Sequence, residues 1–240
     1  MFYGPEQAAI HHERFGGLAA DAARLVLGEL HAAGIESGTV VDLGCGSGIF
    51  AAAVSAAGYD VVGVDISADM VALACATAPR AKFTTGSVHD FAIPVGAVAV
   101  TALGEVLNYA TDHRTGIDAL AAIAGRVRAA LGPNGVFVFD VATPGRAGPR
   151  PDQGRYAEGD GWAIGVRFDE HAEPPELERD ITMFVRDGDA YRRVEEHHVL
   201  RLYPEAEVER TLHDAGFACD VLAGYAGPVD FTGWKVFVGR

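Results

Sequence analysis

The chain has 240 residues, of which 49% are apolar and 22% charged, a balance typical of one globular domain with a real core and room for a small lobe. No apolar run is long enough to span a bilayer, and no secretory signal is recognisable. The three scattered cysteines fit neither a disulfide framework nor a zinc site. We therefore expect a cytoplasmic protein without a membrane partner. The net charge of −14 disfavours a nucleic-acid partner and suits a cationic ligand, although acidic surfaces also simply keep proteins soluble.

The first half of the chain alternates short apolar runs with alanine-rich stretches, the pattern of an α/β fold with a parallel sheet. Helical spacing of apolar residues predicts four helices. They cover about 18–33, 49–57, 67–79 and 112–131. Short β-branched runs predict strands between them, at about 39–43, 60–64, 82–85, 97–101 and 135–141.

The pattern changes after about residue 143. Residues 144–161 are rich in Gly, Pro and Arg and predict a loop, and three strand-length runs follow, with a hairpin signal at Asp187-Gly188-Asp189. A helix that begins at Pro204 and ends at Gly216 then precedes two last strands, at about 217–225 and 231–238. We therefore predict a core at 1–143, an antiparallel lid inserted at 144–203, and a completion of the core sheet at 204–240.

A glycine-rich loop follows the first predicted strand, in the run Asp42-Leu43-Gly44-Cys45-Gly46-Ser47-Gly48. Glycine allows tight turns and close approach of a ligand to the main chain. A dinucleotide fingerprint would need a third glycine where Ile49 stands, and Asp42 would repel a pyrophosphate. The acid favours instead a ligand with an ammonium or sulfonium group.

A second acid, Asp65, ends the next strand about 20 residues beyond Gly44. A carboxylate at the end of a strand usually marks only the change from buried strand to exposed loop. At this spacing from a glycine loop, it is well placed to accept hydrogen bonds from both hydroxyls of a ribose. The two elements together predict an adenosine-containing ligand.

With these motifs the chain resembles class I S-adenosylmethionine-dependent methyltransferases. The run 42–48 is similar to their first motif, and Asp65-Ile66-Ser67-Ala68-Asp69-Met70 is similar to their second. The resemblance implies a Rossmann-like, doubly wound, mostly parallel seven-stranded sheet whose last strand is antiparallel, with a small antiparallel β insertion. It also implies S-adenosylmethionine as cofactor, its methionine part over Gly44, Cys45 and Gly46, its ribose on Asp65, and its adenine near Ile66 and Met70.

Two later segments fit the family less closely. Ser87 stands where an acid is common, and we expect Ser87 and Val88 to contact the adenine edge weakly. The exit of the fourth strand, which includes Leu103 and Gly104, is similar to the segment beside the methyl group. The resemblance thus implies a complete set of cofactor-binding residues: Asp42, Gly44, Cys45, Gly46, Asp65, Ile66, Met70, Ser87, Val88, Leu103 and Gly104.

Methyl transfer needs alignment more than a dedicated base. Glu105 lies past the end of a central strand and is the candidate base, with Asn108 and Tyr109 beside it to orient it. Equally, it could be an acid at the start of a helix or a hydrogen-bond partner of the N-terminal segment. The resemblance implies that the N-terminal segment folds over the cofactor, which makes His11 a candidate substrate ligand; the alternative is a packing or solvent-exposed role. His197 and His198 point to opposite faces of a strand. No cluster has metal-ligand spacing, so we predict a site without metal.

The predicted function is transfer of a methyl group from S-adenosylmethionine to an N or O atom of a small metabolite. The motif that nucleic-acid amino methyltransferases carry after the fourth strand is replaced by Gly104-Glu105-Val106-Leu107, in agreement with the charge. There are three alternatives. The chain could be a nicotinamide-dependent oxidoreductase, a cofactor-binding protein without catalysis, or an enzyme that transfers another group from the same cofactor. We also expect a homodimer through the inserted sheet.

Overall fold

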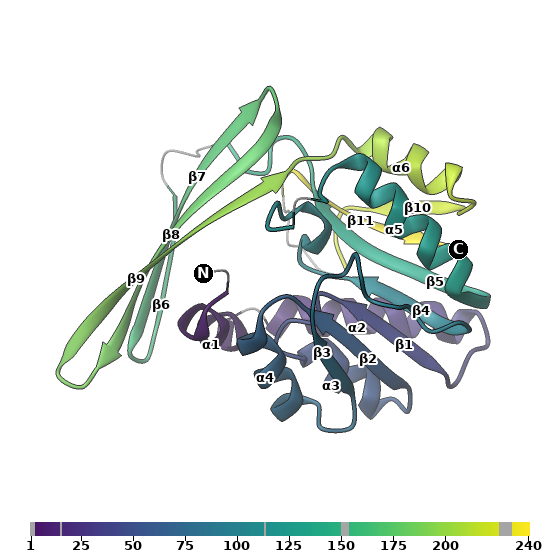
Figure 1. The fold of residues 1–240 in the computed structure, drawn as a ribbon, viewed down its shortest axis with the longest axis horizontal. Helices are drawn as coiled ribbons and strands as arrows, with labels where there is room; N and C mark the ends of the chain where they lie inside the picture. Colours follow the sequence, from purple (N-terminus) through teal and green to yellow (C-terminus); the bar gives the residue numbers. More distant parts are fainter. Residues whose placement is uncertain (1–2, 15, 113, 150–153, 226–231) are drawn as a thin grey trace.

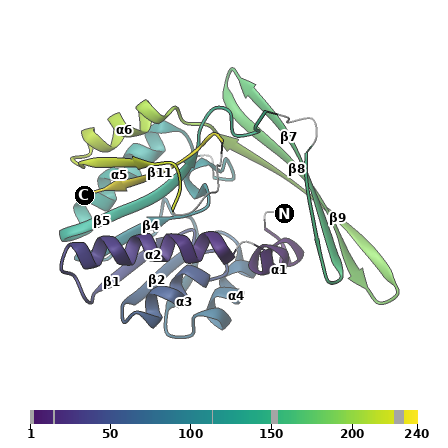
Figure 2. The ribbon, with the colours of Figure 1, turned by 180° about the vertical axis from the view of Figure 1, so that it is seen from behind.

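The computed structural model describes residues 3–14, 16–112, 114–149, 154–225 and 232–240. Figure 1 shows two parts, a sheet flanked by helices and a long twisted antiparallel sheet that projects away from it, with helix α1 (Pro5–Arg14) between them. The view from behind in Figure 2 shows helix α2 (Gly16–Ala32) lying along the core sheet. Within the described part of the chain, no helix is both long and apolar enough to cross a membrane.

The core sheet has seven strands in the order β10-β11-β5-β4-β1-β2-β3. Every neighbouring pair is parallel except those of β11, which runs antiparallel to both β5 and β10. The predicted seven-stranded sheet with an antiparallel last strand is therefore confirmed. The strands are β1 (Thr39–Leu43), β2 (Asp60–Asp65), β3 (Lys82–Thr85), β4 (Ala97–Ala102), β5 (Leu131–Ala142), β10 (Cys219–Leu222) and β11 (Trp234–Gly239).

Helices cover both faces of this sheet because its strands are apolar on both sides. Along β1, Val40 packs into one apolar cluster and Val41 into the other, as the two-residue period of a strand requires. The first cluster contains buried residues of α2 and α3 (Ile49–Ala56), and the second contains those of α5 (Ile117–Ala130) and α6 (Glu205–Asp214). Helix α4 (Ala68–Thr77) begins at Ser67, whose hydroxyl accepts a hydrogen bond from the Met70 amide.

The second sheet has the order β6-β7-β8-β9 and is antiparallel throughout. Its strands are β6 (Arg155–Gly159), β7 (Trp162–Ala172), β8 (Pro175–Asp187) and β9 (Ala190–Arg201), and we call it the lobe. The predicted hairpin between β8 and β9 is present, with Gly188 at φ 61°. The prediction of a loop over 144–161 was wrong in part: β6 lies within it, and its exposed, charged residues give no apolar alternation.

The lobe joins the core at the end of β5. Leu177, Leu200 and Leu202 pack with Ala142 and Ala147 in one buried cluster. The opposite part of the lobe packs on α1, through a second cluster. This second cluster contains Ile10, Trp162, Ile181 and Met183. The N-terminal segment thus lies between the lobe and the core.

Candidate functional site

Three strand ends meet at one edge of the core sheet, because β4, β1 and β2 are neighbours and parallel. The loop after β1 has three glycines with positive φ. A Cβ on Gly44 would lie 2.4 Å from Val106, and one on Gly48 would lie 2.8 Å from the backbone of Ala74, so packing requires both glycines. A Cβ on Gly46, or on Gly104 at the end of β4, would meet nothing within 4 Å. These two glycines leave exposed backbone and open space for a ligand.

Asp65 connects the glycine loop to the end of β2. Its carboxylate accepts hydrogen bonds from the amides of Gly46 and Ser67, each at 2.9 Å. Burial raises the pKa of Asp65, and these backbone donors act in the opposite direction. Each carboxylate oxygen can accept a further hydrogen bond, so Asp65 is oriented and still able to bind hydroxyls.

The two predicted adenine contacts beside Asp65 differ in accessibility. Ile66 is 44% exposed, which is unusual for a large apolar side chain and suits a flat apolar ligand. Met70 is only 3% exposed and packs inward from α4, so it can support such a surface but offers little of it to a ligand. Leu103 is half-buried against the apolar cluster of α2 and α3.

Asp42 is buried beneath the glycine loop. The hydroxyl of Thr101 on β4 donates to it at 2.8 Å, and burial raises its pKa to about 7. Cys45 is also buried, and burial raises the pKa of its thiol far above the ordinary range, so it is not a thiolate nucleophile. Both residues therefore contribute shape and polarity to the loop.

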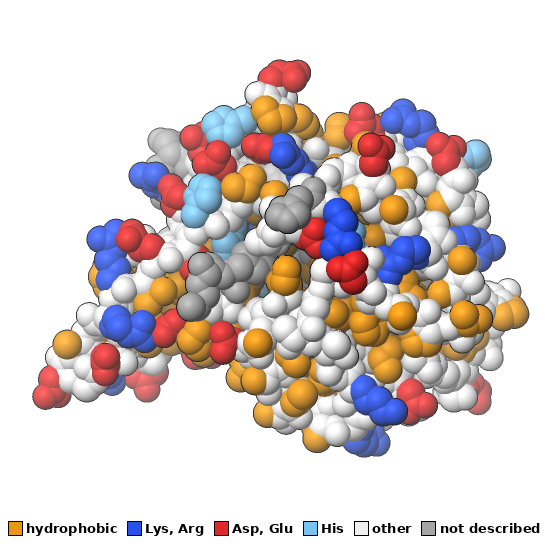
Figure 3. All heavy atoms as spheres, viewed as in Figure 1, with side chains coloured by type: hydrophobic (Ala, Val, Ile, Leu, Met, Phe, Trp, Pro, Cys, Tyr) orange, Lys and Arg blue, Asp and Glu red, His pale blue; other side chains and the backbone are white. Residues whose placement is uncertain are grey.

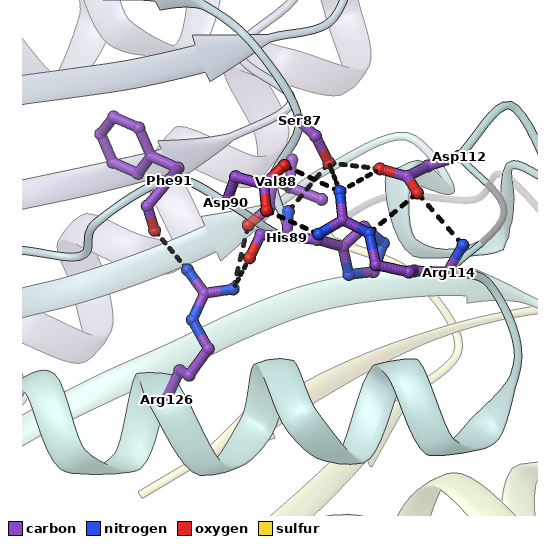
Figure 4. Close-up of polar contacts among 8 residues, drawn as sticks. All are labelled: Ser87, Val88, His89, Asp90, Phe91, Asp112, Arg114 and Arg126. Atoms are coloured by element: carbon purple, nitrogen blue, oxygen red, sulfur yellow. Dashed lines mark hydrogen bonds and ion pairs between the residues drawn. The ribbon is translucent and has the colours of Figure 1, made fainter.

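The segment with Ser87 and Val88 contacts a carboxylate from another part of the chain, where the sequence motif lacks an acid (Figure 4). The Ser87 hydroxyl donates to Asp112 at 2.6 Å, and Arg114 pairs with both Asp112 and Asp90. Arg126 of α5 donates to the carbonyls of residues 88, 89 and 91, which fixes this segment on the core. Asp112 thus provides an acid at this position from 25 residues further along the chain.

Glu105, the candidate base, has a positive φ of 63° and is buried at the end of β4. Its own amide and that of Gly104 donate to Asp140, at 2.5 and 2.7 Å. Its carboxylate pairs with Arg146, and with Arg179 of β8 at 2.7 Å. Burial alone would raise the pKa of Glu105, but the two guanidinium groups lower it to about 2. A carboxylate so paired is a weak proton acceptor, and this geometry favours a structural role.

The prediction that Asn108 binds substrate does not fit the structure. Asn108 lies in the short 3-10 helix η1 (Val106–Asn108) and is fully buried. Its amide nitrogen donates to the carbonyls of Ala142 and Arg201, and its oxygen accepts from the Ala142 amide. The tight turn directs the side chain back to β5, where its hydrogen bonds join the lobe to the core.

Tyr109 and His11 do come together, around Tyr3. The hydroxyls of Tyr109 and Tyr3 are 3.1 Å apart, and the Tyr3 ring lies 5.5 Å from that of His11 and 5.2 Å from that of His198. Burial lowers the pKa of His11 to about 4, so its imidazole is neutral at pH 7. Glu196 of β9 accepts from the amides of Tyr3 and Gly4, which ties this segment to the lobe.

Asp140 of β5 was not predicted as a site residue. It accepts hydrogen bonds from the amides of Gly104 and Glu105, from the Tyr225 hydroxyl and from the Trp234 indole. An acid within an otherwise apolar strand is the only signal in the sequence, because its aromatic partners lie far along the chain. Among the described residues, no group of three or more His, Cys, Asp or Glu could hold a metal ion.

Comparisons with known proteins agree with this geometry. A "Putative methyltransferase YqeM" of Bacillus subtilis (strain 168) is 28% identical over 188 residues, which cover 76% of this chain and 74% of the relative. An S-adenosylmethionine-dependent methyltransferase from Clostridium acetobutylicum ATCC 824 has a similar structure, with a TM-score of 0.82 and 19% identity over 98% of this chain and 97% of that one.

A similar fold is also found in CalS10, an amino pentose methyltransferase from Micromonospora echinaspora solved with S-adenosylmethionine, at a TM-score of 0.73 and 20% identity over 100% of this chain and 98% of the other. The sugar N-methyltransferase KedS8 from Streptoalloteichus sp ATCC 53650 has a TM-score of 0.75 at 21% identity, over 96% and 90%. The family model described as "Methyltransferase domain" matches residues 10–221. The chain therefore belongs to the methyltransferase domain family.

Proposed function

We propose that this methyltransferase uses S-adenosylmethionine and transfers its methyl group to an N or O atom of a small metabolite. The observation that carries the proposal is the pair of open glycines, Gly46 and Gly104, on neighbouring strand ends beside two acids, Asp42 and Asp65. A ligand can lie against the backbone there, and the acids suit a cation that bears a ribose. The likeness to S-adenosylmethionine-dependent methyltransferases supports the same cofactor.

The cofactor would supply a methyl carbon already activated by a sulfonium. The residues of this chain then have to hold and orient two ligands, which can account for about 7–11 kcal/mol of barrier reduction. Asp65 would accept the ribose hydroxyls, and Ile66 would cover one face of the adenine. Gly104 would leave space at the reacting carbon, and the lobe with α1 would exclude water from it.

The substrate side of the proposal is a small molecule, since the lobe and α1 lie over the strand ends. Two of the similar solved structures are named as methyltransferases of a sugar and of an amino pentose, which supports a metabolite acceptor. The predictions of a homodimer and of no nucleic-acid partner stay proposals. Tyr156, Phe184 and Tyr191 are exposed on the lobe and offer an apolar surface for a second copy, which sedimentation velocity would reveal.

Calorimetry with S-adenosylhomocysteine and with NAD tests the cofactor. We expect binding of S-adenosylhomocysteine and no measurable binding of NAD, because Ile49 replaces the third dinucleotide glycine and Asp42 lies beneath the loop. Binding of NAD without binding of S-adenosylhomocysteine would favour the oxidoreductase. Binding of S-adenosylhomocysteine with no turnover of any acceptor would favour the cofactor-binding protein.

A further inference from the structure

Three arginines from separate segments converge beside Gly104. Arg146 follows β5, Arg155 lies on β6 and Arg179 lies on β8. Two of them, Arg146 and Arg179, pair with the carboxylate of Glu105, the residue after Gly104. We call these three guanidinium groups the arginine cluster. It lies at the strand end where the proposed reaction takes place.

Arg155 joins the cluster through an aromatic ring and not through a carboxylate of the described residues. Arg155 lies with its guanidinium 4.9 Å from the ring of Phe168, and Arg179 lies 5.9 Å from the same ring. Partial burial, together with the charges of Arg146 and Arg179, lowers the pKa of Arg155. Within the described ranges, no carboxylate forms an ion pair with Arg155. Arg155 therefore adds a guanidinium group beside the two that share the carboxylate of Glu105.

The hydrogen bonds of two nearby acids come from groups other than Arg155 and Arg179. Asp140 accepts from the amides of Gly104 and Glu105, and Glu170 accepts from those of Gly145 and Ala147. The Nε atom of Arg179 is buried and has no hydrogen-bond partner among the described residues. A buried guanidinium N–H without an acceptor costs free energy, and a bound anion would satisfy it.

We propose that the arginine cluster binds an anionic group of the methyl acceptor, a carboxylate or a phosphate, and so holds the nucleophile toward Gly104. This inference rests on the proposed function and extends it to the class of substrate. The positive charge is local to the arginine cluster, because the molecule as a whole carries a net charge of −14. Acidic and basic side chains are interspersed over the face in Figure 3. Guanidinium groups recognise both anions through paired N–H donors, and the ring of Phe168 keeps two of them in place.

The test compares inorganic phosphate and acetate as probes, each titrated into the whole protein at constant ionic strength and followed by NMR of the ligand. We expect the unaltered protein to bind one or both. Arg155→Gln should weaken that binding about tenfold or more, because a charged hydrogen bond is lost. Arg155→Lys should restore part of the binding. Arg167→Gln, which removes an exposed arginine paired with Asp180 on the lobe, is the matched control and should bind as the unaltered protein does.

The two probes distinguish the acceptor chemistry. Binding of phosphate alone assigns a phosphorylated acceptor, and binding of acetate alone assigns a carboxylate. The inference is overturned if neither anion binds, or if Arg155→Gln and Arg167→Gln bind equally well. S-adenosylhomocysteine affinity, measured separately on the same proteins, reports on the proposed function, so that failure of one leaves the other intact.

Discussion

At the strand ends, three buried carboxylates differ in pKa because their partners differ. Asp42 accepts from a hydroxyl and Asp140 from amides, a phenol and an indole, all neutral donors, and burial raises their pKa values to about 7 and about 6. Glu105 is equally buried, but two guanidinium groups lower its pKa to about 2. Opposite charge within hydrogen-bond distance therefore outweighs desolvation at this site.

The raised pKa of Asp42 predicts a pH-dependent cost. The unfolded chain ionises Asp42 near its ordinary pKa of 3.8, and the folded chain only near 7. The folded state therefore loses stability as the pH rises through this window, at up to about 1.4 kcal/mol per pH unit. Relative to the unaltered protein, Asp42→Asn should become more stable between pH 4 and pH 7. Urea unfolding at both ends of the window measures this, and a constant difference would contradict it.

Asp65→Asn should weaken binding of S-adenosylhomocysteine by about 1.5–3 kcal/mol for each charge-assisted hydrogen bond to the ribose. Non-additivity makes the total smaller than the sum of two such bonds. Asp60→Asn is the control, because Asp60 is exposed at the opposite end of the same strand. Calorimetry on both variants decides the matter, and equal dissociation constants would remove Asp65 from the ribose site.

At the scale of elements, local patterns predicted most strands and helices of the core. The bounds of β1 and β3 were predicted to the residue, since β-branched runs end there at glycine or polar residues. The helix expected from 112 begins instead at Ile117, because Gly116, at φ 112°, lies outside the helical conformation.

The missed parts of the site depend on contacts between distant segments. Asp112 reaches Ser87, and Arg179 reaches Glu105 across 74 residues of sequence. No local periodicity or motif spacing encodes such contacts. The glycine loop and Asp65, in contrast, were predictable because strand, turn and helix follow one another directly in the chain.

Glu105 connects three elements, β4, the loop after β5, and β8, so its removal should loosen the lobe. Glu105→Gln leaves two guanidinium groups without their carboxylate, and loss of one partner of a buried ion pair costs about 3–5 kcal/mol. Arg167→Gln breaks an exposed pair and should cost about 0–1 kcal/mol. Urea unfolding compares the two variants. If Glu105→Gln is no less stable than the control, the structural role assigned to Glu105 is wrong.

For the whole molecule, the lobe and the N-terminal segment form one cover over the strand ends. The lobe rests on the core near Ala142. The N-terminal segment is bound to the lobe through Glu196, which accepts from the Tyr3 amide, and through the bond from the Trp162 indole to Glu13. It is bound to the core through the Ser67 hydroxyl, which donates to the Tyr3 carbonyl. Tyr203, included in the predicted lid, instead belongs to the core: it is buried there, and its hydroxyl donates to the Leu107 carbonyl. The Val199 carbonyl also accepts from the Ala110 amide, and Leu200 packs with Ala142, so the part of the chain that can be removed ends before residue 199.

Replacing residues 155–198 with a short Gly/Ser linker tests whether this cover selects the substrate. The cofactor residues Gly46, Asp65 and Gly104 all lie outside the lobe, so affinity for S-adenosylhomocysteine should stay within about tenfold, or 1.4 kcal/mol. Turnover of the acceptor should collapse, because Arg155 and Arg179 are lost with the lobe and water enters the site. Circular dichroism must first show that the core sheet still folds. If turnover persists at its original rate, the lobe serves only to bury surface or to form a dimer.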